Sequence, residues 1–192
     1  MNKTDNYQKH TSKNPLKKFF ISNFFNILLN QIKNLRIQSF LDVGCGEGFT
    51  LNKLKENKIG KVHEGIDYSR EAISLGKKAY PDLHISEGNI YNLKYKDNSF
   101  DLVICSEVLE HLEDPQKALK ELSRVSKKYI LLSVPNEPWF YIFNYTQWGK
   151  DIDHINKWTS LGFKKFIQQN SSAKILSLKT PFPWTVVLLK KD

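Results

Sequence analysis

The chain has 192 residues, 40% hydrophobic and 26% charged, so its composition lies close to the average of globular proteins. Its mean hydropathy is negative, which argues against a polytopic membrane protein. The length suits a single core and no Gly/Ser/Pro-rich linker divides it, so we expect one domain over residues 1–192. The net charge of +9 suits anionic partners, but the lysines are scattered rather than clustered with arginine and aromatic residues. A nucleic-acid partner is therefore possible without being indicated.

Cysteine usage and the first residues bear on location. Cys45 and Cys105 lie far apart in the chain, each at the end of an expected buried strand, so no disulfide framework is implied. The first fifteen residues are polar and lack the apolar segment and cleavage site of a secretory signal. Both observations favour a cytoplasmic location.

The N-terminal region, residues 1–35, divides into a tail and an amphipathic helix. Residues 1–14 are polar and are expected to fray, whereas apolar residues recur at helical spacing from Pro15 to about Leu35. We expect this helix to pack on a sheet or to cover a binding site. An interfacial membrane helix is the alternative, since Lys17 and Lys18 flank a Phe-rich face. Serine and asparagine residues interrupt the apolar run, so the helix cannot span a bilayer.

Beyond this helix, short apolar runs alternate with helical patterns, which is typical of βαβ units around a parallel sheet. The expected strands are Ile37–Val43, Lys61–Ile66, Leu83–Glu87, Phe100–Cys105 and Tyr129–Val134. The expected helices between them are Gly48–Asn57, Ser69–Ala79 and Asp114–Ser126, the last with Asp114 as N-cap and Pro115 in its first turn. An aromatic-rich insertion over residues 135–158 then leads to a helix near Thr159–Gln169 and two strands, Lys174–Lys179 and Trp184–Lys190.

A glycine-rich turn follows the first expected strand. Gly44, Gly46 and Gly48 come directly where the strand ends and a helix begins, so the backbone can turn sharply and approach a ligand closely. The spacing G-x-G-x-G differs from the G-x-G-x-x-G of dinucleotide enzymes. Asp42 precedes the turn, and its carboxylate would repel a phosphate but suits a ligand that carries an ammonium group. The turn is therefore predicted to bind a cofactor that is not a dinucleotide.

The next two strands also end in polar residues. Asp67 follows the glycines at the offset from which an acidic side chain reaches ribose hydroxyls, and Tyr68 could lie against an adenine. Capping of the next helix is the alternative role for Asp67. Asn89 offers a donor and an acceptor to an adenine edge and Ile90 an apolar contact, although a plain turn explains Asn89 almost as well.

These segments, together with Asp97–Leu112, closely resemble the class I S-adenosylmethionine-dependent methyltransferases over residues 37 to 135. The resemblance implies a doubly wound, Rossmann-like α/β sheet of seven strands, mostly parallel, with the last strand antiparallel and inserted beside the fifth. It implies S-adenosyl-L-methionine as cofactor, with Asp42 placing the amino group and Asp67 holding the ribose diol. The family often has Asp where this chain has Asn89. The residues expected to bind the cofactor are Asp42, Gly44, Cys45, Gly46, Gly48, Asp67, Tyr68, Asn89, Ile90 and Ser106.

The chemistry is expected to depend on two histidines. Methyl transfer is an in-line displacement for which orientation alone can suffice, but a hydroxyl acceptor benefits from a base. His111 and His154 are the predicted catalytic residues. With Glu107 and Glu110 they are similar to the magnesium-binding set of small-RNA 2′-O-methyltransferases and, in part, of ubiquinone-pathway O-methyltransferases. The Glu-Val-Leu-Glu-His segment also occurs in metal-free relatives, so we expect no metal.

The acceptor is left open by these patterns. The aromatic side chains of the insertion 135–158 could bind the acceptor or, as the alternative, pack against the N-terminal helix as a lid. With Pro135-Asn136-Glu137-Pro138 and His154 to Trp158, the insertion also looks like bacterial methyltransferases of cell-surface glycan or glycolipid synthesis. We expect O-methylation of a small-molecule or glycan/lipid-linked acceptor. Peripheral membrane contact through residues 15–35 stays open. The competing functions are those of a metal-dependent RNA or quinone-precursor O-methyltransferase and of a non-catalytic nucleotide-binding module. An NAD-dependent oxidoreductase is disfavoured by the glycine spacing and by the lack of a Tyr-x-x-x-Lys pair after the fourth strand.

Overall fold

A computed structural model describes residues 4–140, 142 and 154–191 of the chain. Its helices are α1 (Asp5–His10), α2 (Pro15–Ile32), α3 (Phe49–Glu56), α4 (Arg70–Ala79), the 3-10 helix η1 (Leu109–His111), α5 (Pro115–Val125) and α7 (Ser160–Asn170). Its strands are β1 (Ser39–Val43), β2 (Val62–Asp67), β3 (His84–Glu87), β4 (Phe100–Ser106), β5 (Ser126–Pro135), β6 (Lys174–Lys179) and β7 (Trp184–Lys190). Most aromatic residues of the insertion, Tyr141, Phe143, Tyr145 and Trp148, lie outside the described residues.

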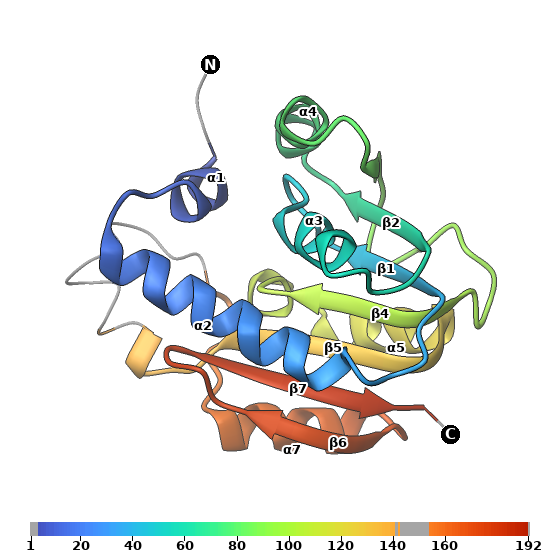
Figure 1. Ribbon diagram of the computed structural model, residues 1–192. Helices are drawn as coiled ribbons and strands as arrows, with labels where there is room; N and C mark the ends of the chain where they lie inside the picture. Colours follow the sequence, from blue (N-terminus) through green and yellow to red (C-terminus); the bar gives the residue numbers. More distant parts are fainter. Residues whose placement is uncertain (1–3, 141, 143–153, 192) are drawn as a thin grey trace.

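The seven strands form one sheet in the order β3-β2-β1-β4-β5-β7-β6. Strands β1 to β5 pair in parallel, and β7 runs antiparallel between β5 and β6 (Figure 1). The predicted fold class, including the position of the antiparallel last strand, is confirmed. The chain leaves β1 toward β2 on one side and continues through β4 on the other, so the switch point of the sheet lies between β1 and β4. Ligands of such folds bind beyond the carboxyl ends of the strands at this point.

Two hydrophobic layers hold the helices on opposite faces of the sheet. One layer joins α2, α3 and α4 to one face, and the other joins α5 and α7 to the opposite face (Figure 1). The α2 side chains that reach the core are Phe24, Phe25, Leu28 and Ile32. Burial of each such side chain contributes about 1.5–3 kcal/mol. The expectation that this helix packs on the sheet is therefore confirmed.

The polar N-terminal tail differs from the prediction. Residues 5–10 form helix α1 instead of a frayed segment. The helix is short and polar, and its contacts lie in distant parts of the chain: the Thr4 hydroxyl and the Asn6 amide both donate to the buried Glu47 carboxylate, and His10 stacks on Phe49 with ring centroids 4.3 Å apart. Such long-range contacts leave no periodic signal in the sequence, so the helix could not be predicted from its own residues.

Candidate functional site

The glycine-rich turn bends as its sequence requires. Gly44, Gly46 and Gly48 have φ angles of +76°, +54° and +84°, a region that side chains disfavour. The backbone N–H groups of Gly44 and Cys45 both donate to the carbonyl of Ile66, at 2.8 and 3.0 Å. The turn is thereby fixed against the end of β2, and its backbone faces the cavity at the carboxyl edge of the sheet.

Asp67 connects the two strand ends. Its Oδ2 accepts the Gly46 N–H at 2.7 Å and its Oδ1 accepts the Ser69 N–H at 2.8 Å, while the residue is only 8% exposed. Ser69 caps α4 itself by accepting the Ala72 N–H. The carboxylate is therefore held rigidly at the rim of the cavity, and each oxygen keeps a second lone pair for a ligand hydroxyl.

Asp42 is buried beneath the same turn, 1% exposed. Burial, and secondly the charge of Asp67, raise the pKa of Asp42 from 3.8 to about 7, against a lowering by the Leu51 backbone amide. Its Oδ2 is buried and has no hydrogen-bond partner among the described residues. A ligand ammonium group would supply both the missing partner and a compensating charge. The site thus fits the amino group of the expected cofactor.

The residues expected around the adenine line the same cavity. Tyr68 is 84% exposed at the rim, and Ile90 also lines the cavity. The Asn89 side-chain oxygen accepts the Tyr91 N–H at 2.9 Å, which is the geometry of the plain turn considered for this residue. Its amide nitrogen remains the group that could face an adenine acceptor.

The cavity that these residues line has a volume of about 1810 Å³ as bounded by the described residues. Pockets for single small ligands measure roughly 300–1,000 Å³, so this one has room for a cofactor and an acceptor together. Helices α1 and α2 form one wall, to which Asn6, Lys17 and Phe24 contribute.

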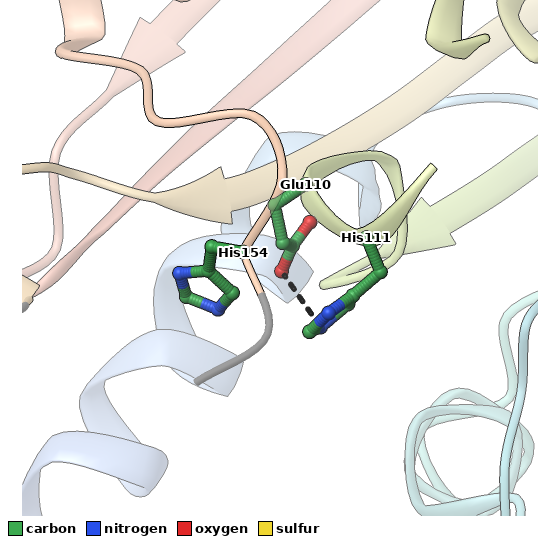
Figure 2. Close-up of side chains that lie close together, drawn as sticks. All are labelled: Glu110, His111 and His154. Atoms are coloured by element: carbon green, nitrogen blue, oxygen red, sulfur yellow. Dashed lines mark ion pairs between the residues drawn. The ribbon is translucent and has the colours of Figure 1, made fainter. Parts of the chain in front are cut away.

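A group of acidic and imidazole side chains also lines this cavity. Glu110, His111 and His154 each place one ligand atom within 4.8 Å of the others, and the two imidazole centroids lie 5.0 Å apart (Figure 2). Glu110 is 1% exposed, whereas the side chain of His111 is 46% exposed. The two predicted catalytic histidines therefore lie side by side, although they come from distant parts of the chain.

Hydrogen bonds of Asn156 hold His154 beside Glu110 and His111. The Asn156 backbone N–H donates to the Glu110 carbonyl at 2.9 Å, and its side-chain amide donates to the carbonyls of Leu109 and Leu112 at 3.2 and 2.6 Å. These bonds fix the segment after residue 153 against η1.

Glu137 belongs to the Pro135-Asn136-Glu137-Pro138 segment, to which the sequence assigned no catalytic role, and it contacts His154 from just beyond the end of β5. Its Oε1 lies 3.2 Å from Nδ1 of His154, and both side chains are at most 10% exposed. Burial lowers the pKa of His154, and nearby His111 and Lys157 lower it as well. The Glu137 carboxylate raises this pKa, but the net result is a lowering. The imidazole is consequently neutral near pH 7 and able to accept a proton.

A separate hydrogen-bond network surrounds the tip of β4. The hydroxyls of Ser106 and Ser133 lie 2.8 Å apart, and Ser133 donates to the Glu107 carboxylate at 3.0 Å. Glu107 lines the cavity but does not belong to the group of ligand atoms within 4.8 Å. Only part of the four-residue set suggested by the sequence thus converges.

Known proteins resemble this chain in sequence and in fold. The family profile described as a methyltransferase domain matches residues 41–131. An uncharacterised methyltransferase of Schizosaccharomyces pombe is 40% identical over 98 residues, which cover 45% of this chain and 35% of that protein. A demethylmenaquinone methyltransferase of Renibacterium salmoninarum is 34% identical over 90 residues, covering 47% of this chain and 37% of that protein. The match thus spans only about a third of these relatives' length.

Among solved structures, protein PH0226 of Pyrococcus horikoshii superimposes with a TM-score of 0.75 over 100% of both chains. Its sequence identity is 16%, so this likeness concerns the fold alone. Within the part of the chain that the structure describes, no helix has the length and apolar character needed to cross a membrane.

Proposed function

We propose that this chain, whose residues 41–131 match the methyltransferase-domain profile, is a class I methyltransferase with S-adenosylmethionine as cofactor, and that it methylates an acceptor held beside His154 and His111. The observation that carries the proposal is one cavity lined both by a cofactor-type turn and by a buried carboxylate and two imidazoles. We further propose that residues 1–192 act as one domain.

Four groups of this chain would hold the cofactor. The Asp42 carboxylate would accept hydrogen bonds from the ammonium group, and the Asp67 carboxylate would accept them from the ribose hydroxyls. The backbone at Gly44 and Gly46 would lie against the methionine part. The orphaned Oδ2 of Asp42 and the rigid carboxylate of Asp67 support these roles. When bound, the cofactor supplies a methyl group activated by its sulfonium.

The residues near the methyl group favour an acceptor hydroxyl. His154 would accept the acceptor's proton as the O–CH3 bond forms and the electron pair of the S–CH3 bond stays on sulfur. Its lowered pKa keeps it in the required neutral form. His111 is half-exposed beside it and would pass the proton on to solvent.

Aromatic side chains would recognise the body of the acceptor. Phe24, Phe140 and Trp184 line the cavity, and the Phe140 ring centroid lies 5.4 Å from that of His154. They suit an apolar or sugar-bearing small molecule or a glycan/lipid-linked acceptor. The exposed side chains of Leu16 and Phe19 on α2 support peripheral contact with a membrane that carries a lipid-linked acceptor.

Metal-assisted O-methylation is the second candidate, because Glu110, His111 and His154 could together hold a divalent ion. Such an ion would lower the pKa of the acceptor hydroxyl. Metal-dependent RNA and quinone-precursor enzymes are the classes this variant would match. EDTA separates the candidates, since it would abolish only the metal-assisted reaction.

The proposal is tested by incubating the protein and a cell extract with methyl-labelled S-adenosylmethionine and searching for labelled products by mass spectrometry. Labelled product that appears with the wild type and disappears with His154→Ala supports the proposal. Binding of S-adenosylhomocysteine without transfer to any component of the extract would favour the non-catalytic binding module instead.

A further inference from the structure

Glu137 contacts His154 on the side away from the cluster with Glu110 and His111. Nδ1 of His154 lies 3.2 Å from Oε1 of Glu137. The second ring nitrogen faces the side of Glu110 and His111 in Figure 2. The imidazole is thus held between a carboxylate behind it and the cavity in front of it.

The chemistry of the two groups determines which nitrogen carries the proton. A neutral imidazole has one N–H and one lone pair, and an ionised carboxylate can only accept. The contact with Glu137 therefore requires the proton on Nδ1 of His154 and leaves the lone pair on Nε2, toward the cavity. Either role proposed for His154, base or metal ligand, needs the lone pair in that position.

The backbone around Glu137 is fixed by the same segment that carries His154. The Glu137 N–H donates to the carbonyl of Trp158 at 2.8 Å, and the Asn136 side chain accepts the Ser160 N–H at 3.1 Å. The carboxylate and the imidazole therefore keep their relative positions without either being exposed, which is the arrangement needed to select one tautomer.

We infer that Glu137 is the positioning residue of the site: it fixes the Nδ1–H tautomer of His154, aims Nε2 at the acceptor and stabilises the imidazolium that forms when the proton is accepted. The inference rests on the proposed function for its consequence, but the tautomer can be measured on the protein without any acceptor.

The test is a long-range 1H–15N correlation spectrum of the histidine side chains, with the His154 signals assigned from His154→Ala. The wild type is expected to give the Nδ1–H pattern. In Glu137→Ala the pattern should invert to the Nε2–H tautomer that histidine favours in water. Glu137→Asp, which keeps the carboxylate, should restore a substantial share of the Nδ1–H form. The matched control is Glu113→Ala, which removes an exposed glutamate close to His111 and should change nothing.

Backbone amide spectra of each variant would show whether the fold is kept, and Glu137→Gln provides a variant of equal size if Glu137→Ala unfolds. An Nε2–H pattern in the wild type, or the same tautomer in wild type and in folded Glu137→Ala and Glu137→Gln, would overturn the inference. With an acceptor in hand, Glu137→Ala should lower kcat by about 10- to 100-fold while S-adenosylhomocysteine binds as before. An inverted tautomer in a protein that methylates nothing would count against the proposed function and would still support Glu137 as the group that sets the tautomer.

Discussion

Replacing Asp42 by asparagine should stabilise the ligand-free protein at neutral pH and weaken its cofactor binding. Burial raises the pKa of Asp42 from 3.8 to about 7. A carboxyl with a raised pKa in the folded state costs stability as pH rises from its unfolded pKa to its folded pKa. At 1.36 kcal/mol for each pH unit between the two values, the cost is about 4 kcal/mol at most. The neutral asparagine avoids this cost, although its buried amide needs partners, so we expect a gain of about 2–4 kcal/mol above pH 7.

The assay is urea unfolding of both proteins from pH 4 to pH 8, evaluated as the difference in unfolding free energy. Titrating groups that do not interact with Asp42 are common to both proteins and cancel in this difference, whereas Asp67, whose charge acts on Asp42, does not cancel completely. The unfolding free energy of the wild type should drop progressively below that of Asp42→Asn between pH 4 and pH 7. Above pH 7 the difference should stay constant. Calorimetric titration should then give weaker binding of S-adenosylhomocysteine to Asp42→Asn, because the ammonium group loses its charged partner. Parallel stability curves together with unchanged affinity would refute the role given to this carboxylate.

Three further changes test different parts of the site. Asp67→Ala should weaken S-adenosylhomocysteine binding by about 1–3 kcal/mol in calorimetry, with the exposed Asp82→Ala as control; equal affinities would refute the ribose assignment. Gly46→Val should abolish cofactor binding, because a β-branched residue disfavours φ +54° and its Cβ would lie 3.1 Å from the Asn6 amide. A folded valine variant with normal affinity would show that the glycine-rich turn is not the cofactor site. His154→Ala should lower turnover by on the order of 10²–10⁴-fold. The wild-type rate should rise with pH as His154 loses its proton, at a pKa lowered below 6.5, and EDTA should leave the rate unchanged. A loss of activity with EDTA that added metal restores would favour the metal-assisted candidate.

The alternating part of the sequence predicted its structure well, because local signals and tertiary packing agree there. Asp114 caps α5 by accepting the Lys117 N–H at 2.9 Å, with Pro115 in the first turn as expected. The strands Lys174–Lys179 and Trp184–Lys190 begin and end at the predicted residues. β7 is buried along almost its whole length and β6 pairs with it at the edge of the sheet, so neither segment has much freedom for a different structure.

The parts that could not be predicted depend on contacts between distant residues. Hydrogen bonds to the Glu47 carboxylate stabilise helix α1. Hydrogen bonds from Asn156 to η1 and to Leu112 bring His154 close to His111. Glu137 was noted only as part of the Pro135-Asn136-Glu137-Pro138 segment, because nothing in the sequence places its carboxylate beside His154. A search for acidic residues near a predicted catalytic histidine would have needed the position of the insertion, which only the fold provides.

The polar residues at the strand ends lie at one edge of the sheet, as predicted, but they also form hydrogen bonds within the protein. Asp67 already accepts two backbone N–H groups, and Asn89 already forms a turn. Both residues can therefore stabilise the loops as well as meet a ligand, and sequence position alone does not separate these roles.

A crystal structure of the complex with S-adenosylhomocysteine would test the central claim most directly. The account predicts the amino group on the Asp42 carboxylate, the ribose on Asp67 and the sulfur facing His154. Nε2 of His154 should lie within hydrogen-bond reach, or one bridging water, of the space where an acceptor oxygen meets the methyl group. A complex in which the ligand avoids Asp42, or in which the sulfur lies more than about 10 Å from His154, would contradict the account, because a base at that distance cannot reach the acceptor's proton.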